Sequence, residues 1–242
     1  MIDEDGILHF RFGVAAVLFD ARPIFTALQV GKEVGRIHVT EPADARLSEL
    51  ALHLATRSQM LMRCLRYLDD ALVTAIKSAI PVGEDQGCSR LDDTDIYSLL
   101  LFIDCFLFES YAYMEVLEKL VKCVLVEALG VSRDNARRAF AKIRDQSGRV
   151  GQKTWNGFLS DVRNHFSHAA TPWIAIDRTR RAEGVYDVVV MRENIVDFAG
   201  ADPRKYFFAV KDLNAAWEGL MNTAGNFQEY ILDKLRSQPR GR

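Results

Sequence analysis

Residues 94–129 read TDIYSLLLFIDCFLFESYAYMEVLEKLVKCVLVEAL, and they are the most apolar segment of the chain. Asp92 or Asp93 stands before them as a candidate N-cap, and Gly130 after them is a typical helix stop. Between residues 99 and 116 apolar side chains occupy nearly every side of such a helix, so neighbouring elements must cover it from several directions. The stretch therefore predicts a long, largely buried helix inside a helical bundle.

Four other segments carry the signals of helices. From residue 42 to residue 76 leucines recur at intervals of three, four or seven, which places them on one stripe of a helix. Further helices are expected at residues 132–146, 153–168 and 213–235. Two β-type runs, residues 173–177 and 185–191, are separated by polar, Gly-containing residues and predict a hairpin. The expected fold is an all-α, up-and-down bundle of about five helices with this hairpin inserted before the last helix.

The first 41 residues differ from the rest. Residues 9–12 and 24–30 are rich in β-branched and aromatic side chains and are punctuated by Gly and Pro, which favours short strands or an irregular cap. The predicted organisation is a small N-terminal cap over residues 1–41 and a helical domain over residues 42–242.

The composition narrows the classes of protein. The chain has 242 residues, 49% of them apolar and 26% charged, with a net charge of −2, as in ordinary globular proteins. Its longest apolar run, residues 99–108, is about half a membrane span, and its acidic start lacks the positive charge of a signal peptide. The four cysteines form no C-x-x-C pair, so no zinc site is expected. We predict a cytoplasmic protein without membrane segments, metal or other cofactor.

The charged residues are distributed unevenly along the chain. Residues 131–181 hold eleven Lys or Arg against four Asp or Glu, so this stretch carries +7 and the remainder −9. Clustered cations of this kind can bind a polyanion such as RNA, because binding releases counterions. The alternative is that they form an ordinary solvated surface of a helix. The candidate nucleic-acid-binding residues are Arg133, Arg137 and Arg144, which share one helical face, together with Arg138 and Lys142.

A compact motif follows this basic segment. In residues 161–168, DVRNHFSH, Arg163, Asn164 and His168 stand near the end of the predicted short helix. Asn164 and His168 are one helical turn apart, so the amide can orient the imidazole, whereas Arg163 lies about 140° from His168 around an ideal helix. Imidazole transfers protons near neutral pH, and guanidinium binds phosphate through paired hydrogen bonds. These groups suffice for RNA cleavage by attack of the 2′-hydroxyl, without a metal ion.

The motif Arg163-Asn164-His165-Phe166-Ser167-His168 resembles the signature of HEPN domains, a family of small α-helical ribonucleases, toxins and nucleotide-binding modules. The resemblance covers residues 42–237 and includes the layout of a long apolar helix, a short helix that ends in the motif, and a final helix. It implies that Arg163 stabilises phosphate, that His168 moves the proton and that Asn164 positions both. It also implies a homodimer whose two motifs share one cleft.

Two details qualify the resemblance. Some toxins of the family carry a Tyr two residues after the His, as the target of a partner nucleotidyltransferase, and this chain has Ala170 there. The resemblance further implies that an acid on the long apolar helix holds the motif Arg. Glu109 is the preferred candidate and Asp104 the alternative, and a salt bridge or cap unrelated to any site is the plainer explanation of either.

The sequence thus predicts a metal-independent, dimeric endoribonuclease of HEPN type, acting on RNA as a toxin or defence effector, with an antitoxin or regulatory partner. Two other functions remain open. One is a catalytically inactive relative that binds nucleic acid or nucleotide through the same basic surface. The other is a helical protein-interaction module with no affinity for RNA.

Overall fold

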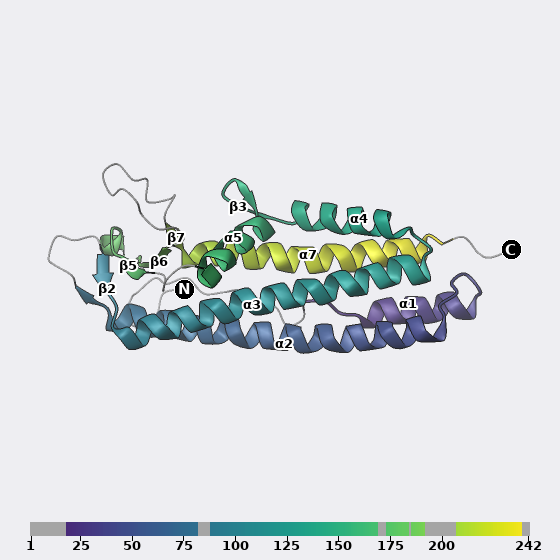
Figure 1. Cartoon of the computed structure of the whole chain (residues 1–242), viewed down its shortest axis with the longest axis horizontal. Coiled ribbons are helices and arrows are strands. Elements are labelled where there is room, and N and C mark those ends of the chain that lie inside the picture. The colour runs from purple at the N-terminus through teal and green to yellow at the C-terminus, as the bar shows by residue number, and fades with distance from the viewer. Residues whose placement is uncertain (1–17, 82–87, 169–172, 184, 192–206, 239–242) are drawn as a thin grey trace. The chain divides into compact units, whose positions relative to one another are not determined.

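The computed structural model describes residues 18–81, 88–168, 173–183, 185–191 and 207–238 (Figure 1). Over these residues it is predominantly helical, which confirms the predicted all-α fold class. The α-helices are α1 (Arg22–Glu33), α2 (Glu41–Ser78), α3 (Asp93–Cys123), α4 (Arg133–Gln146), α5 (Trp155–His168) and α7 (Val210–Arg236). A π-helical turn, η1 (Val124–Ala128), continues α3, and a 3-10 turn, η2 (Arg181–Glu183), follows β5. No helix in this described part combines the length and the apolar character that crossing a membrane requires.

The strands form two antiparallel sheets. The larger has the order β1-β2-β5-β6-β7, and its strands are β1 (Ile80–Pro81), β2 (Cys88–Arg90), β5 (Ile174–Asp177), β6 (Asp187–Met191) and β7 (Phe207–Ala209). Within it, β5 and β6 pair in register from Ile174 opposite Val190 to Asp177 opposite Asp187, which confirms the predicted hairpin. The smaller sheet pairs β3 (Arg149–Val150) with β4 (Lys153–Thr154) through a turn in which Gly151 has a positive φ of 59°.

Contacts between residues divide the chain into two compact units. The described part of unit 1 lies within Met62–Phe108 and Gly157–Trp217, and that of unit 2 within Ala15–Leu61, Glu109–Asn156 and Glu218–Arg242. The division falls inside α2, α3, α5 and α7, and each unit is described below by itself. The boundary expected between residues 41 and 42 stays a prediction.

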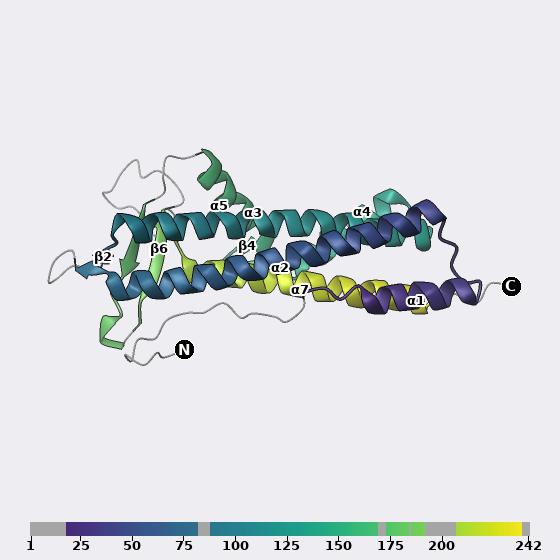
Figure 2. The same cartoon turned by 90° about the horizontal axis from the view of Figure 1, so that it is seen from below.

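Unit 1 packs the larger sheet and parts of the long helices around an apolar core. Phe158 of α5 meets Phe208 of β7 edge to face, with ring centroids 5.8 Å apart. Tyr67 of α2 stacks on Phe102 of α3, two helices that run side by side in both views (Figures 1 and 2). As expected, Asp92 caps α3, because its Oδ1 accepts the backbone N–H of Asp95 at 2.8 Å.

Unit 2 contains α1, and here the sequence-based expectation was wrong. The strand predicted over residues 24–30 belongs to the helix α1, whereas residues 9–12 lie outside the described part. Pro23 occupies the first turn, where its missing N–H costs nothing, and Ile24, Leu28 and Gly31 are buried at helical spacing. A Cβ on Gly31 would lie 2.4 Å from Cδ1 of Ile37, so glycine lets the following chain cross closely.

The second contact that shapes unit 2 lies where α7 passes the start of α5. A Cβ on Gly219 of α7 would lie 2.4 Å from Cγ of Trp155, so only glycine leaves room for the fully buried indole. The indole N–H of Trp155 donates to the carbonyl of Arg144 at 2.9 Å. Nearby, Asn222 and Asn226 of α7 donate to the carbonyl and hydroxyl oxygens of Ser147. These contacts hold the end of α4 and the start of α5 against α7.

Candidate functional site

The predicted catalytic residues stand on α5, whose two sides differ sharply in burial. Its first turns bury Trp155, Phe158, Leu159 and Val162, at spacings that define one helical face. Arg163, Asn164 and His168, in its last turns, are all exposed. The buried face therefore fixes the helix, and its C-terminal turns present the three polar side chains to solvent.

The order of these residues on α5 determines which of them meet. Because α5 remains helical through His168, Asn164 and His168 lie one turn apart on the same face of the helix. Arg163 lies about 140° around the helix from His168, so its guanidinium can approach the imidazole only through the length of its side chain. His165, the second histidine of the motif, is half-buried. The arrangement offers an imidazole and a guanidinium to a ligand that lies across the end of α5.

Glu109, the acid expected to hold Arg163, has a different partner in unit 2. Its side chain is only 6% exposed, and both carboxylate oxygens accept from Nη1 of Arg57 on α2 at 3.1 Å. This pair corresponds to the plainer explanation, a salt bridge within the bundle. Arg163 belongs to unit 1, so a contact between Glu109 and Arg163 stays a prediction. Asp104, the alternative acid, is exposed and forms no ion pair with any residue that the structure describes.

The predicted basic helix is confirmed as α4. Its N-cap is Ser132, whose hydroxyl accepts the backbone N–H of Asn135 at 3.3 Å, and Ala136 and Phe140 form its buried face. Phe140 stacks on Phe227 of α7, with ring centroids 4.5 Å apart. This packing turns four of the predicted RNA-binding side chains to solvent: Arg133, Arg137, Arg138 and Lys142.

Arg144 differs from the other four predicted binding residues. It is half-buried, and its Nε donates to Oδ1 of the neighbouring Asp145 at 2.8 Å. Because a nearby carboxylate already neutralises this guanidinium, Arg144 is a weaker phosphate ligand than the exposed cations of α4.

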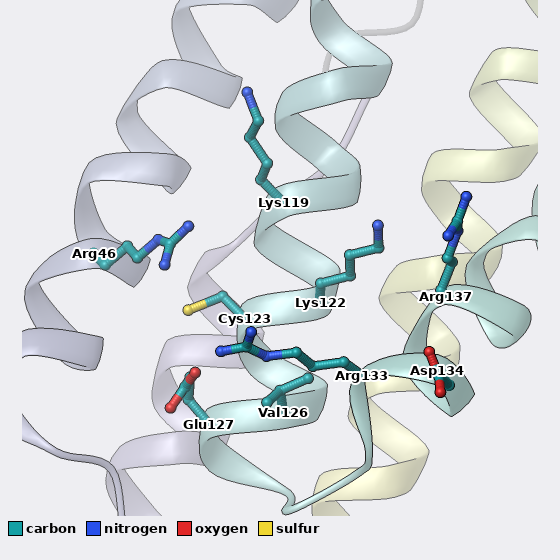
Figure 3. Close-up of a pocket in the computed structure, with 9 residues that line it drawn as sticks. All are labelled: Arg46, Lys119, Lys122, Cys123, Val126, Glu127, Arg133, Asp134 and Arg137. Atoms are coloured by element: carbon teal, nitrogen blue, oxygen red, sulfur yellow. The ribbon is translucent and has the colours of Figure 1, made fainter.

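A pocket of about 410 Å³ opens in unit 2 beside the start of α4 (Figure 3). It takes its lining from α2, from the end of α3 with η1, and from α4, and it contains the predicted residues Arg133 and Arg137. The remaining lining residues are Arg46, Lys119, Lys122, Cys123, Val126, Glu127 and Asp134. In Figure 3, Arg46 and Arg133 enter the pocket from opposite sides, and in this view the side chain of Cys123 lies between their guanidinium groups.

Sequence reasoning missed three cations of this pocket, Arg46, Lys119 and Lys122. The charge count was confined to residues 131–181, and these side chains come from earlier helices. Lys119 and Lys122 are three residues apart, and this spacing is the signal that could have placed both lysines on one side of α3.

Burial also affects the thiol in this pocket. Cys123 is 7% exposed, and this desolvation raises its pKa above the usual range, since the thiolate loses its hydration. The charge of Arg46 acts in the opposite direction and lowers the pKa, and that of Glu127 raises it further. The net effect keeps Cys123 a neutral thiol at pH 7, so it contributes no negative charge to the pocket.

Within the ranges that the structure describes, no group of three or more His, Cys, Asp or Glu side chains is placed to hold a metal ion. In comparisons with known proteins, no family model, curated protein or solved structure matches the chain.

Proposed function

We propose that this protein is a metal-independent endoribonuclease of HEPN type, with Arg163, Asn164 and His168 as its catalytic group. The observation that carries the proposal is the exposure of all three side chains on the last turns of a helix anchored by a buried face. A catalytic group needs both features, because it must reach its substrate and must stay in place while the substrate reacts.

The residues present account for each chemical step of the proposed cleavage. The imidazole of His168 in one protomer accepts the proton of the 2′-hydroxyl. The 2′-oxygen then forms a bond to phosphorus while the bond from phosphorus to the 5′-oxygen breaks. A protonated imidazole donates a proton to the departing 5′-oxygen. Arg163 stabilises the negative charge that develops on the phosphorane oxygens. The products are a 2′,3′-cyclic phosphate and a 5′-hydroxyl.

A homodimer supplies the second imidazole in this scheme. The exposed side of α3 in unit 1 supports the proposal of a homodimer. There Tyr97, Leu101 and Phe108 are more than half exposed and lie on one helical stripe. Asp104 lies on the same stripe. Exposed apolar side chains that share a face mark interaction surfaces more often than scattered ones do. Light scattering of Leu101→Glu should then show a monomer, and Leu52→Glu, at an exposed leucine of α2 in unit 2, should leave the dimer intact.

The decisive experiment measures cleavage of a labelled RNA by the full-length protein in excess chelator. Arg163→Ala and His168→Ala should each lower the rate by about 100-fold or more, as expected for loss of a charge donor or a general base. His53→Ala, at an exposed histidine on α2, is the matched control and should keep full activity. Cleavage that requires a divalent metal, or that survives both substitutions on α5, would refute the mechanism.

A second candidate function is binding of RNA without cleavage, and the exposed cations of α4 favour it. Arg133, Arg137, Arg138 and Lys142 can neutralise several phosphates of a polyanion. In this case the affinity for RNA should fall steeply between 50 and 200 mM salt, as is usual for several phosphate contacts. The RNA should remain intact, and His168→Ala should not change the affinity.

A further inference from the structure

The pocket of unit 2 holds more positive charge than its own residues neutralise. Five of its lining residues are cations, from three different elements, and two are acids: Arg46, Lys119, Lys122, Arg133 and Arg137 against Glu127 and Asp134. The lining residues alone differ by three positive charges, and the glutamates paired with Lys119 and Lys122 reduce this excess to one. In a concave site this excess raises the local potential, because the protein walls limit screening by water.

The two kinds of cation in the pocket differ in their partners. Lys119 and Lys122 form ion pairs with Glu115 and Glu118, one turn earlier on α3. The arginines Arg46, Arg133 and Arg137 form no ion pair with any residue in the described ranges. Their guanidinium groups are therefore available to a ligand, and each can bind two phosphate oxygens at once.

The geometry of the pocket favours a compact ligand. Its volume of about 410 Å³ lies within the usual range for small-molecule sites. Arg46 and Arg133 approach it from opposite sides, α2 and α4, with the side chain of Cys123 between them in the view of Figure 3. The start of α4 adds the partial positive charge of a helix N-terminus. By contrast Arg138 and Lys142, which extend the basic surface along α4, do not line the pocket.

We propose that this pocket binds a small phosphate-bearing molecule with two or more linked phosphates, of the charge and size of a nucleoside di- or triphosphate. Arg46 and Arg133 hold the phosphates from two sides, and Arg137 adds the attraction of a third unpaired guanidinium. The proposal is independent of the chemistry on α5, because it uses only residues of unit 2.

The test is isothermal titration calorimetry of the full-length protein at low salt, with inorganic pyrophosphate and ATP as probes. We expect saturable binding with one site per chain. Arg46→Gln and Arg133→Gln should each weaken it by roughly 10-fold or more, in line with loss of a charge-assisted hydrogen bond. Both residues are exposed and outside the core, so the variants should fold normally.

Two controls make the result specific. Arg138→Gln and Lys142→Gln remove the same charge from the same exposed helix outside the pocket, and should change the affinity less than about 2-fold. His168→Ala should bind both probes normally even if it abolishes RNA cleavage, so failure of either proposal is recognised separately.

Two outcomes would overturn the proposal. The first is absence of saturable binding of either probe to the unmodified protein. The second is an affinity for both probes that falls equally in the pocket variants and in the two controls, which would indicate a diffuse cationic surface. If an RNA oligonucleotide binds instead and all four variants weaken it, the pocket is part of an extended RNA surface rather than a small-molecule site.

Discussion

Two glycines of α7 should respond in opposite ways to the same substitution. In Gly219→Ala the new methyl group would lie 2.4 to 2.7 Å from three atoms of Trp155, where carbon atoms normally keep about 3.5 to 4.0 Å. At Gly225 a methyl group would meet nothing within 4 Å. Since both positions are inside one helix, the gain in helix propensity from alanine is the same at each, about 1 kcal/mol.

The contacts of Trp155 determine the cost at Gly219. The indole is fully buried, and its N–H donates to the carbonyl of Arg144, so it cannot retreat without breaking that bond. Overpacking a rigid core costs about 1–3 kcal/mol, and a buried N–H left without its partner costs about the same again. After subtraction of the propensity gain, Gly219→Ala should destabilise the protein by roughly 1–5 kcal/mol. Gly225→Ala should stabilise it by up to about 1 kcal/mol.

Thermal unfolding followed by circular dichroism, together with tryptophan fluorescence, measures both variants. A change of 1 kcal/mol shifts Tm by about 2–4 °C in a chain of this size, so Gly219→Ala should lower Tm by about 2–20 °C. Gly225→Ala should leave Tm unchanged or raise it by a few degrees. Equal Tm values for the two variants would refute the close packing of α7 against Trp155.

Three further results are expected. Arg57→Met should destabilise the protein by about 3 kcal/mol because it leaves buried Glu109 uncompensated, and the double variant with Glu109→Gln should recover most of the loss in urea unfolding. Burial raises the pKa of Tyr113, so above about pH 10, where the phenol ionises only in the unfolded chain, the free energy of unfolding should fall with rising pH. In Tyr113→Phe this fall should be smaller, and an unchanged dependence on pH would contradict the prediction. Since Arg46 lowers the pKa of Cys123, Arg46→Gln should slow alkylation of that thiol at pH 8 a few-fold, and faster alkylation would argue against the predicted coupling.

The periodic spacing of apolar residues predicts the long helices, but near the start of the chain the composition and the spacing indicate different structures. Residues 24–30 are rich in β-branched and aromatic side chains, a composition that favours a strand, whereas the spacing of their apolar residues favours a helix. In α1 the positions of Ile24, Leu28 and Gly31 carry the decisive information, because they place one apolar face toward the core. The short strands β1, β2 and β7 could not be predicted, since pairs such as Cys88 with Asp177 join segments far apart in sequence.

The prediction of the candidate sites was also limited to residues that are close in sequence. Local charge counting found Arg133 and Arg137, and it also included Arg144, whose neighbour Asp145 neutralises it. A buried carboxylate predicts that some cation pairs with Glu109, but it does not say which one. Arg57 is 52 residues away, and only the packing of α2 against α3 within unit 2 brings the two together.

The π-helical turn η1 has a consequence for how this region tolerates change in length. In η1 the N–H of Leu129 donates to the carbonyl of Val124, five residues back, so the turn contains one residue more than an α-helical turn. Deleting a single residue within η1 would convert it to ordinary helix with little rotation of the preceding residues relative to Gly130, because the wide turn already absorbs one extra residue; the same deletion in regular α-helix rotates the preceding residues by about 100°. Lys119, Lys122 and Cys123, which precede the wide turn, would then keep facing Arg133. The surplus residue is therefore one that the chain can lose here, and we expect a one-residue deletion inside η1 to be tolerated better than a one-residue deletion within α3.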